Sequence, residues 1–221
     1  MLAKELISDI VPFLRKSDTG QKALTWMEIF RISHLPIVHN DEFIGLVSDT
    51  DIYDLNMVEE SIGNYHLSAM RPFVKGNQHI YEVIEIVSRL KLTLVPVLGE
   101  ADNYLGVITL YDLLQKFASL TAVQNPGGII VLEMNLYDFS LTQIAHIIEG
   151  NDAKLLSLYV DSPKDTTRIE VTIKLNRIDI SAVIETFERY GYDIKATYLG
   201  ENTQESIYQN RYELLLNYLN M

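Results

Sequence analysis

Three carboxylates crowd into the stretch GLVSDTDIYDL, residues 45–55. Asp49, Asp51 and Asp54 fall within six positions, a spacing that could serve a hard cation or acid–base chemistry. A hard cation needs several oxygens that converge on one point, and Asp49 and Asp51 are expected to diverge where a strand becomes a helix. No recurring histidine or nucleophile–base pair accompanies them. We therefore predict neither a metal site nor a catalytic site.

The first half of the sequence is an internal repeat. A shift of 60 residues places Pro36 on Pro96, and after one inserted residue Asp51 falls on Asp112. Other residues that coincide are Phe13 with Phe73, Arg15 with Lys75, Gly45 with Gly106, and Ser48 with Thr109. Asp49 has no acidic counterpart in the second copy, so a cluster of acids would exist once only. What both copies share is Gly-x-x-Ser/Thr-x-x-Asp.

Each copy is expected to hold this motif between a strand and a helix. A helical pattern of apolar residues is followed by two short apolar runs around a polar turn, which predict a hairpin, and then by a second helix. These elements are expected at residues 23–30, 35–47 and from Thr50 in the first copy, and at 80–90, 94–108 and from Leu110 in the second. With a short extended piece around Phe13 and Phe73, the predicted order is β-α-β-β-α for residues 1–60 and again for 61–124.

The shared motif has a structural and a functional interpretation. Ser48 and Thr109 stand three residues before Asp51 and Asp112, which is the pattern of a capping box at a helix start. The same junction leaves backbone N–H groups that suit a phosphate. Its carboxylate could accept hydrogen bonds from both hydroxyls of a ribose, and its glycine would let a ligand approach the backbone.

The two copies resemble a pair of cystathionine-β-synthase (CBS) domains. The matching stretches are LPIVHNDEFIGLVSDTD and LVPVLGEADNYLGVITLYD. The resemblance implies two clefts that often hold an adenosine-containing ligand such as AMP, ATP or S-adenosylmethionine. It also implies that Asp51 and Asp112 bind the ribose, with Ser48 and Thr109 as their hydroxyl neighbours. The alternative is a structural dimerisation module whose clefts stay empty.

Further residues that coincide under the repeat complete the predicted nucleotide-binding set. They are Gly45, Gly106, Arg15, Lys75, Phe13 and Phe73. The two cations could neutralise a phosphate, and the two aromatic rings could pack on a base. The structural alternatives are solvated cations and aromatic rings that belong to the core.

The second half predicts a separate domain after the linker signal QNPGG, residues 124–128. Strands are expected at 129–134, 154–160, 168–175 and 193–199, and helices at 141–150 and 178–192, each helix ended by a glycine. This β-α-β-β-α-β order over residues 129–200 is the ferredoxin-like pattern. With YGYDIKATY, it resembles an ACT domain. The loop NLYDFS lacks the glycine usual in members that bind amino acids, so we expect a dimerisation role.

The tail, residues 201–221, predicts a terminal amphipathic helix. Tyr208, Tyr212, Leu215 and Leu219 recur at helical spacing. CBS pairs associate through helices and ACT domains often associate side by side, so the resemblance implies a symmetric homodimer. The predicted fold class is α/β (α+β): two CBS domains, a ferredoxin-like ACT-type domain and a terminal helix. In order and length this resembles the acetoin-utilisation type of regulatory protein.

Composition narrows the class of protein. The net charge is −12, which disfavours nucleic acid as a partner. Cysteine is absent, so disulfides, cysteine-ligated zinc and a thiol nucleophile are excluded. No apolar run is long enough to span a bilayer, and the N-terminus lacks the pattern of a secretory signal. We predict a cytoplasmic regulatory or sensor protein that is not an enzyme, needs no cofactor and does not bind a membrane.

Overall fold

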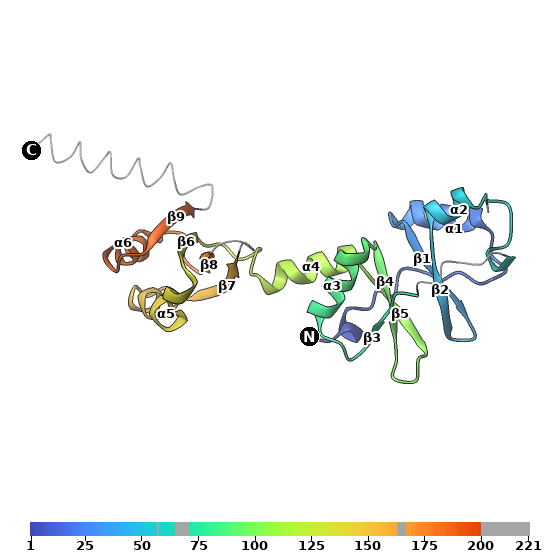
Figure 1. Ribbon diagram of the computed structural model, residues 1–221, viewed down its shortest axis with the longest axis horizontal. Coiled ribbons are helices and arrows are strands. Elements are labelled where there is room, and N and C mark those ends of the chain that lie inside the picture. The colour runs from blue at the N-terminus through green and yellow to red at the C-terminus, as the bar shows by residue number, and fades with distance from the viewer. Residues whose placement is uncertain (57, 65–70, 163–166, 200–221) are drawn as a thin grey trace, which may run out of the picture. The chain divides into compact units, whose positions relative to one another are not determined.

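The computed structural model describes residues 1–56, 58–64, 71–162 and 167–199 (Figure 1). The chain divides into two compact units, Met1–Lys116 and Phe117–Met221. The predicted terminal helix lies outside the described residues. None of the helices within these ranges is long and apolar enough to cross a membrane.

The first unit contains the two copies, and the predicted order of their helices and hairpins is confirmed. The first copy comprises η1 (Ala3–Leu6), α1 (Gly20–Phe30), β1 (His34–His39), β2 (Glu42–Ser48) and α2 (Asp49–Asp54), and the short helix η2 (Ile62–Asn64) follows it. The second comprises β3 (Val74–Lys75), α3 (Ile80–Leu90), β4 (Leu94–Leu98), β5 (Tyr104–Thr109) and α4 (Leu110–Leu120). The extended piece before the first helix is a two-residue strand in the second copy and only a single bridge, Leu14 to Ile37, in the first.

The first helix of each copy ends in the same way. Arg31 closes α1 with φ 54° and Lys91 closes α3 with φ 53°, both in the left-handed region. The N–H of the next residue donates to a carbonyl of the preceding helical turn. Ile32 N–H donates to Met27 O at 3.0 Å, and Leu92 N–H donates to Val87 O at 3.0 Å. This Schellman geometry satisfies carbonyls at the helix end and buries the side chain that follows.

Each copy then forms an antiparallel hairpin. β1 pairs with β2 and β4 with β5, and both ladders shift register at the same place, after Ile37 and after Val97. The first turn is tight, because Asn40 and Asp41 have φ values of 49° and 62°. Two successive residues with positive φ match the twist of the strands they join.

The two copies share one hydrophobic core. Leu35 and Ile37 of β1 are fully buried together with Leu94 and Val97 of β4. The chain start also joins the copies, because its backbone forms hydrogen bonds with the second copy. Ala3 N–H donates to Gln78 O at 2.9 Å, and Ser8 N–H donates to Val107 O at 2.8 Å.

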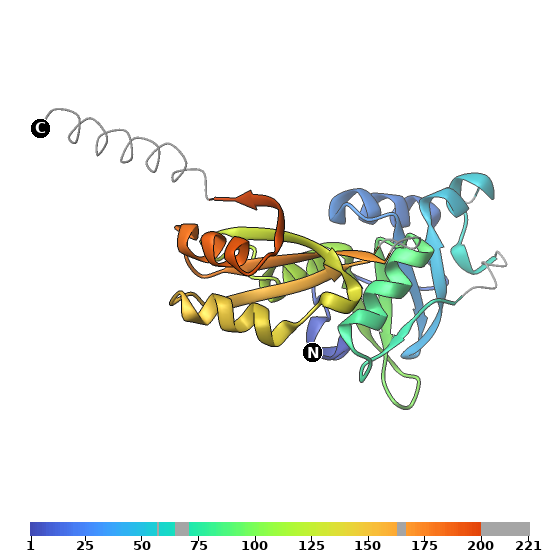
Figure 2. The same ribbon diagram turned by 60° about the vertical axis from the view of Figure 1, so that its left-hand side comes forward.

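Residues 129–162 and 167–198 of the second unit form a four-stranded antiparallel sheet and two α-helices. Its elements are β6 (Ile129–Asn135), η3 (Leu136–Asp138), α5 (Leu141–Gly150), β7 (Leu155–Asp161), β8 (Arg168–Leu175), α6 (Ser181–Arg189) and β9 (Asp193–Tyr198). The strand order β7-β8-β6-β9 is that of a ferredoxin-like fold, as predicted. Helices α5 and α6 lie side by side (Figures 1 and 2). Their side chains Ile144 and Phe187 are buried in one cluster with Ile130 and Ile173 of the sheet.

The helix ends in this unit follow the prediction in part. α5 spans Leu141–Gly150, as predicted, and Gly191 follows α6 with φ 78°. The C-cap of α5 is Asn151, whose side-chain amide donates to Ile147 O at 2.8 Å, and the residue with positive φ is Asp152 rather than a glycine. α6 is shorter than the predicted span 178–192.

Candidate functional site

The shared motif forms a capping box in the first copy. Ser48 N–H donates to Asp51 Oδ2 at 2.9 Å, and the Ser48 hydroxyl donates to the same oxygen at 2.7 Å. In return, Asp51 N–H donates to Ser48 Oγ at 3.0 Å. The reciprocal bonds hold the carboxylate over the first turn of α2 and confirm the predicted capping role.

The second copy repeats this arrangement. The Thr109 hydroxyl donates to Asp112 Oδ2 at 2.6 Å, and Asp112 N–H donates to Thr109 Oγ1 at 3.1 Å. In both copies the cap uses Oδ2, and Oδ1 of Asp51 and Asp112 makes no hydrogen bond with any residue of the described ranges. Both aspartates are partly exposed. Each junction therefore offers one uncommitted carboxylate oxygen.

The glycines of the motif are not equivalent. A Cβ at Gly45 would meet nothing within 4 Å, so the backbone there is open to approach. Gly106 has φ 149°, and a Cβ there would lie 2.5 Å from Cγ2 of Ile7. The close approach at Gly106 is thus made by the chain's own N-terminal segment.

A polar network links the two junctions across the interface between the copies. Ser33 N–H donates to Thr93 Oγ1 at 3.0 Å, and Nδ1 of His34 lies 3.0 Å from the same hydroxyl. Ser33 O accepts Asp49 N–H at 3.1 Å, and Thr93 O accepts Leu110 N–H at 2.9 Å. The first residue of α2 and the first residue of α4 are therefore each tied to one member of the network.

His34 is held neutral in this network. Thr93 N–H also points to Nδ1 of His34, at 3.4 Å, so Nδ1 accepts and Nε2 carries the proton. Burial lowers the pKa of His34, although the carboxylates of Asp49 and Asp51 act in the opposite direction. The sequence carries a signal for this network, since Ser33 and Thr93, which both bear hydroxyls, coincide under the 60-residue shift.

The structure does not bring Phe13 and Arg15 to the junction of their own copy. Leu14, which lies between them, bridges to Ile37, whereas Ser48 pairs with His34 at the start of β1. Three residues of strand separate these two positions, which is about 10 Å. The alternative of core rings is wrong, because the exposed fractions of Phe13 and Phe73 are 39% and 38%.

Lys75 is engaged within its own copy. Its Nζ donates to Gly99 O at 3.0 Å and forms an ion pair with Asp102. The same nitrogen lies 5.8 Å from the centroid of the Phe73 ring. Lys75 is therefore already neutralised by a partner in the hairpin turn that follows β4.

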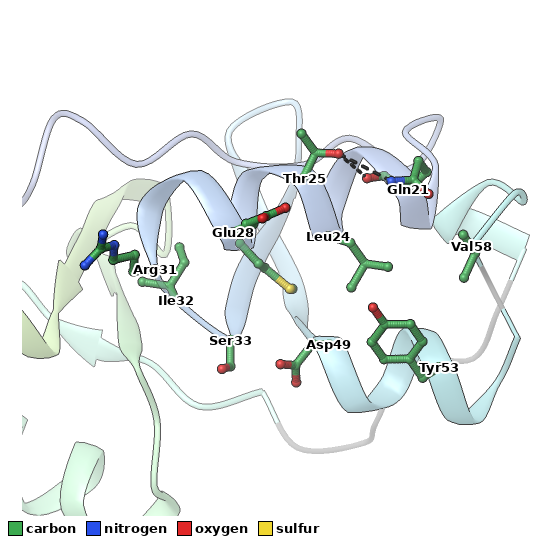
Figure 3. Close-up of a pocket in the computed structure, with 11 residues that line it drawn as sticks. Gln21, Leu24, Thr25, Glu28, Arg31, Ile32, Ser33, Asp49, Tyr53 and Val58 are labelled. Atoms are coloured by element: carbon green, nitrogen blue, oxygen red, sulfur yellow. Dashed lines mark hydrogen bonds between the residues drawn. The ribbon is translucent and has the colours of Figure 1, made fainter.

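A groove of about 550 Å³ runs between α1 and α2 behind the first junction (Figure 3). Leu24 and Tyr53 point into it from the two helices, and Asp49 and Ser33 lie at one end. Asp49 thus faces this groove, while Asp51 bonds back to Ser48. The two carboxylates diverge as expected, and among the described residues no cluster of three acids or histidines could hold a metal ion.

A family comparison decides the nature of the first unit. The model of the CBS domain matches residues 3–57 and again residues 67–119. Residues 3–119 are a tandem pair of CBS domains. The pair is also similar to an inosine-5'-monophosphate dehydrogenase of Methanocaldococcus jannaschii, with 24% identity over 129 residues. That match covers 57% of this chain and 25% of the relative, so the chain spans about a quarter of the relative's length.

The chain is also similar to several solved structures. A CBS domain pair/ACT domain protein from Thermotoga maritima is 22% identical, with a TM-score of 0.48 over 54% of this chain and 98% of that one. A candidate acetoin utilization protein from Vibrio cholerae is 22% identical, with a TM-score of 0.49 over 56% and 95%. CBSX2, solved in complex with AMP, is 14% identical, with a TM-score of 0.46 over 53% and 96%.

Proposed function

We propose that this CBS pair is a regulatory sensor, without a catalytic role, that binds an adenosine-containing ligand such as AMP, ATP or S-adenosylmethionine. The observation that carries the proposal is the uncommitted Oδ1 of Asp51 and of Asp112. A carboxylate oxygen has two lone pairs and can accept from both hydroxyls of a ribose while Oδ2 keeps the cap. The two roles of each aspartate are therefore compatible.

The second junction suits a phosphorylated ligand better than the first. Position 110 is a leucine, whereas the equivalent position in the first copy is the carboxylate of Asp49. α4 is also longer than α2, with 11 residues against 6, and so presents a stronger positive end. A phosphate at Thr109 would meet less repulsion, and we expect this junction to be occupied first.

Thermal unfolding of the full chain with AMP, ATP and S-adenosylmethionine is the first test. A ligand at 100 times its Kd should raise the free energy of unfolding by about 2.7 kcal/mol. Calorimetry on Asp112→Ala should then show affinity reduced by about tenfold or more, because a charge-assisted hydrogen bond is lost. Loss of the cap should lower stability by only about 1 kcal/mol.

Asp54→Ala is the matched control. Asp54 is exposed at the end of α2 and forms no part of either junction, so its removal should leave binding unchanged. Equal affinity in Asp112→Ala and the wild type would remove the second junction from the proposal. If none of the three compounds shifts the unfolding curve, the pair is better explained as a dimerisation module with empty clefts.

We also propose that the chain forms a homodimer. α4 exposes a run of apolar side chains: Leu110, Tyr111, Leu114, Phe117 and Leu120 are all more than 40% exposed. Apolar surface of this kind is typical of an interface between chains. For the second unit we propose a contribution to dimerisation rather than the binding of an amino acid, because the β6–α5 connection lacks glycine.

A further inference from the structure

A hollow of about 600 Å³ lies beside the turn of the first hairpin, on the segment that leads into α1. Arg15, Lys16 and His39 line it, together with the ring of Phe13. Among the described residues that line it, Asp41 is the only carboxylate. In a chain of net charge −12, this convergence of cationic and donor groups makes a locally positive site.

The backbone of this segment is fixed while its basic side chains are uncommitted. Arg15 N–H donates to Asp18 Oδ2 at 2.8 Å, and Lys16 O accepts Gly63 N–H at 2.8 Å. Asp18 is itself paired with Lys22 at 2.7 Å. Within the described ranges, the guanidinium of Arg15 and Nζ of Lys16 form no ion pair and no hydrogen bond.

His39 adds a directed donor. The side-chain amide of Asn40 lies 3.3 Å from Nε2 of His39. An amide NH₂ can only donate, so Nε2 accepts and the ring proton sits on Nδ1. That N–H remains available to an anion in the hollow.

The second copy provides an internal comparison. There Lys75 stands in place of Arg15, and it is paired with Asp102, the counterpart of Asp41. Glycines occupy the positions equivalent to Lys16 and His39. In the second copy, the one basic side chain at these positions, Lys75, is therefore neutralised by Asp102. In the first copy, three basic side chains line the hollow, and Arg15 forms no ion pair with Asp41.

We infer that Arg15, Lys16 and His39 form a binding site for a small phosphorylated compound that carries a planar ring. A guanidinium recognises phosphate through two parallel hydrogen bonds, and a lysine adds a point charge. The ring of Phe13 is 39% exposed and packs edge-on against Tyr104, with 5.8 Å between centroids, so a fixed apolar surface borders the site. The site is separate from the junction at Asp51 and requires no ribose.

Phenyl phosphate and inorganic phosphate are the probes, because neither contains a ribose. Calorimetry on the full chain should show that phenyl phosphate binds several-fold more tightly than phosphate. Arg15→Gln combined with Lys16→Gln should weaken both by at least about tenfold, through loss of charge-assisted hydrogen bonds. Phe13→Ala should abolish the preference for phenyl phosphate and leave the affinity for phosphate unchanged.

Two further variants locate the site. Asp41→Asn should strengthen binding of both probes, since it removes the one carboxylate of the hollow. Lys75→Gln, the matched change in the second copy, should leave binding of both probes unchanged; a loss equal to that of the double variant would overturn the inference. It is also overturned if the wild type binds neither probe at millimolar concentration, or if the double variant binds as the wild type does. None of these results depends on whether the junctions bind adenosine.

Discussion

At the scale of single residues, Asp51 and Asp112 cap the starts of α2 and α4 whether or not a ligand is bound. In each copy one carboxylate oxygen receives the hydroxyl and the backbone N–H of the motif, so the side chain is oriented in advance. A ligand that used the second oxygen would not have to order this side chain, which reduces the entropic cost of binding. The spacing of the motif predicted the cap, and the cap explains why the carboxylate is positioned for a second role.

His34 makes the folded state sensitive to acid. Burial places its pKa below the ordinary value of about 6.5, so the folded chain resists a proton that the unfolded chain accepts. Its contribution to stability is therefore complete above about pH 6.5 and is lost as the pH falls through the folded-state pKa. Urea unfolding at about pH 7.5 and about pH 5.5 should show that the free energy of unfolding falls less between these pH values for His34→Leu than for the wild type.

Leucine is the natural choice, because Leu94 occupies the equivalent position of the second copy. His39→Leu is the control, since His39 is exposed and lies outside the network. An unchanged pH dependence in His34→Leu would show that the titration of this residue does not govern the loss.

At the scale of secondary structure, the two first helices end on residues that are poorly suited to the position. Arg31 and Lys91 adopt the left-handed conformation, which costs a residue with a Cβ about 1–2 kcal/mol. Glycine has no such cost but loses more entropy on folding, by about 0.4–1 kcal/mol. Arg31→Gly and Lys91→Gly should therefore each stabilise the chain by about 0.5 kcal/mol, measured as a higher midpoint of urea unfolding.

Arg31→Ala and Lys91→Ala separate this effect from loss of the charge. Alanine keeps the Cβ, so the alanine variants should gain nothing. Glycine variants less stable than their alanine partners would contradict the conformational argument.

Most elements could be predicted from the sequence, because alternation and helical spacing are local signals. The hairpins, α3 and the ferredoxin-like order needed nothing more. The end of α5 at Gly150 was also predicted, although the Asn151 side chain, and not a left-handed glycine, caps the helix. At the site, the separation of Arg15 from Asp51 depends on where Leu14 meets β1, and the network of His34 joins residues 59 positions apart. Local spacing of apolar and polar residues does not encode such long-range pairings.

At the scale of the whole molecule, the repeat is one folding unit. Its buried residues form a single cluster drawn from both copies, so neither copy has a complete core alone. Residues 1–116 are therefore expected to unfold in one transition. The two sequence repeats are therefore expected to behave as a single cooperative folding unit.

Assembly is testable at the same scale. Light scattering on the full chain at micromolar concentration should give a mass of about twice 25.3 kDa. A chain shortened to end at residue 124 should dimerise more weakly, because it lacks residues 125–221, which are most of the second unit. A monomeric full chain contradicts the homodimer, and equal dimerisation of both chains contradicts the contribution of the second half.

The pairing of the chain start with the second copy has a consequence for synthesis. Ser8 finds its backbone partner only at Val107, so about a hundred residues must leave the ribosome before that bond can form. At the usual rate of translation this takes about 5–20 seconds. During that interval the nascent first copy exposes Leu35 and Ile37, which the finished fold buries completely. The nascent chain is therefore a candidate for chaperone binding, and slow translation would lengthen the time for which these apolar side chains are exposed.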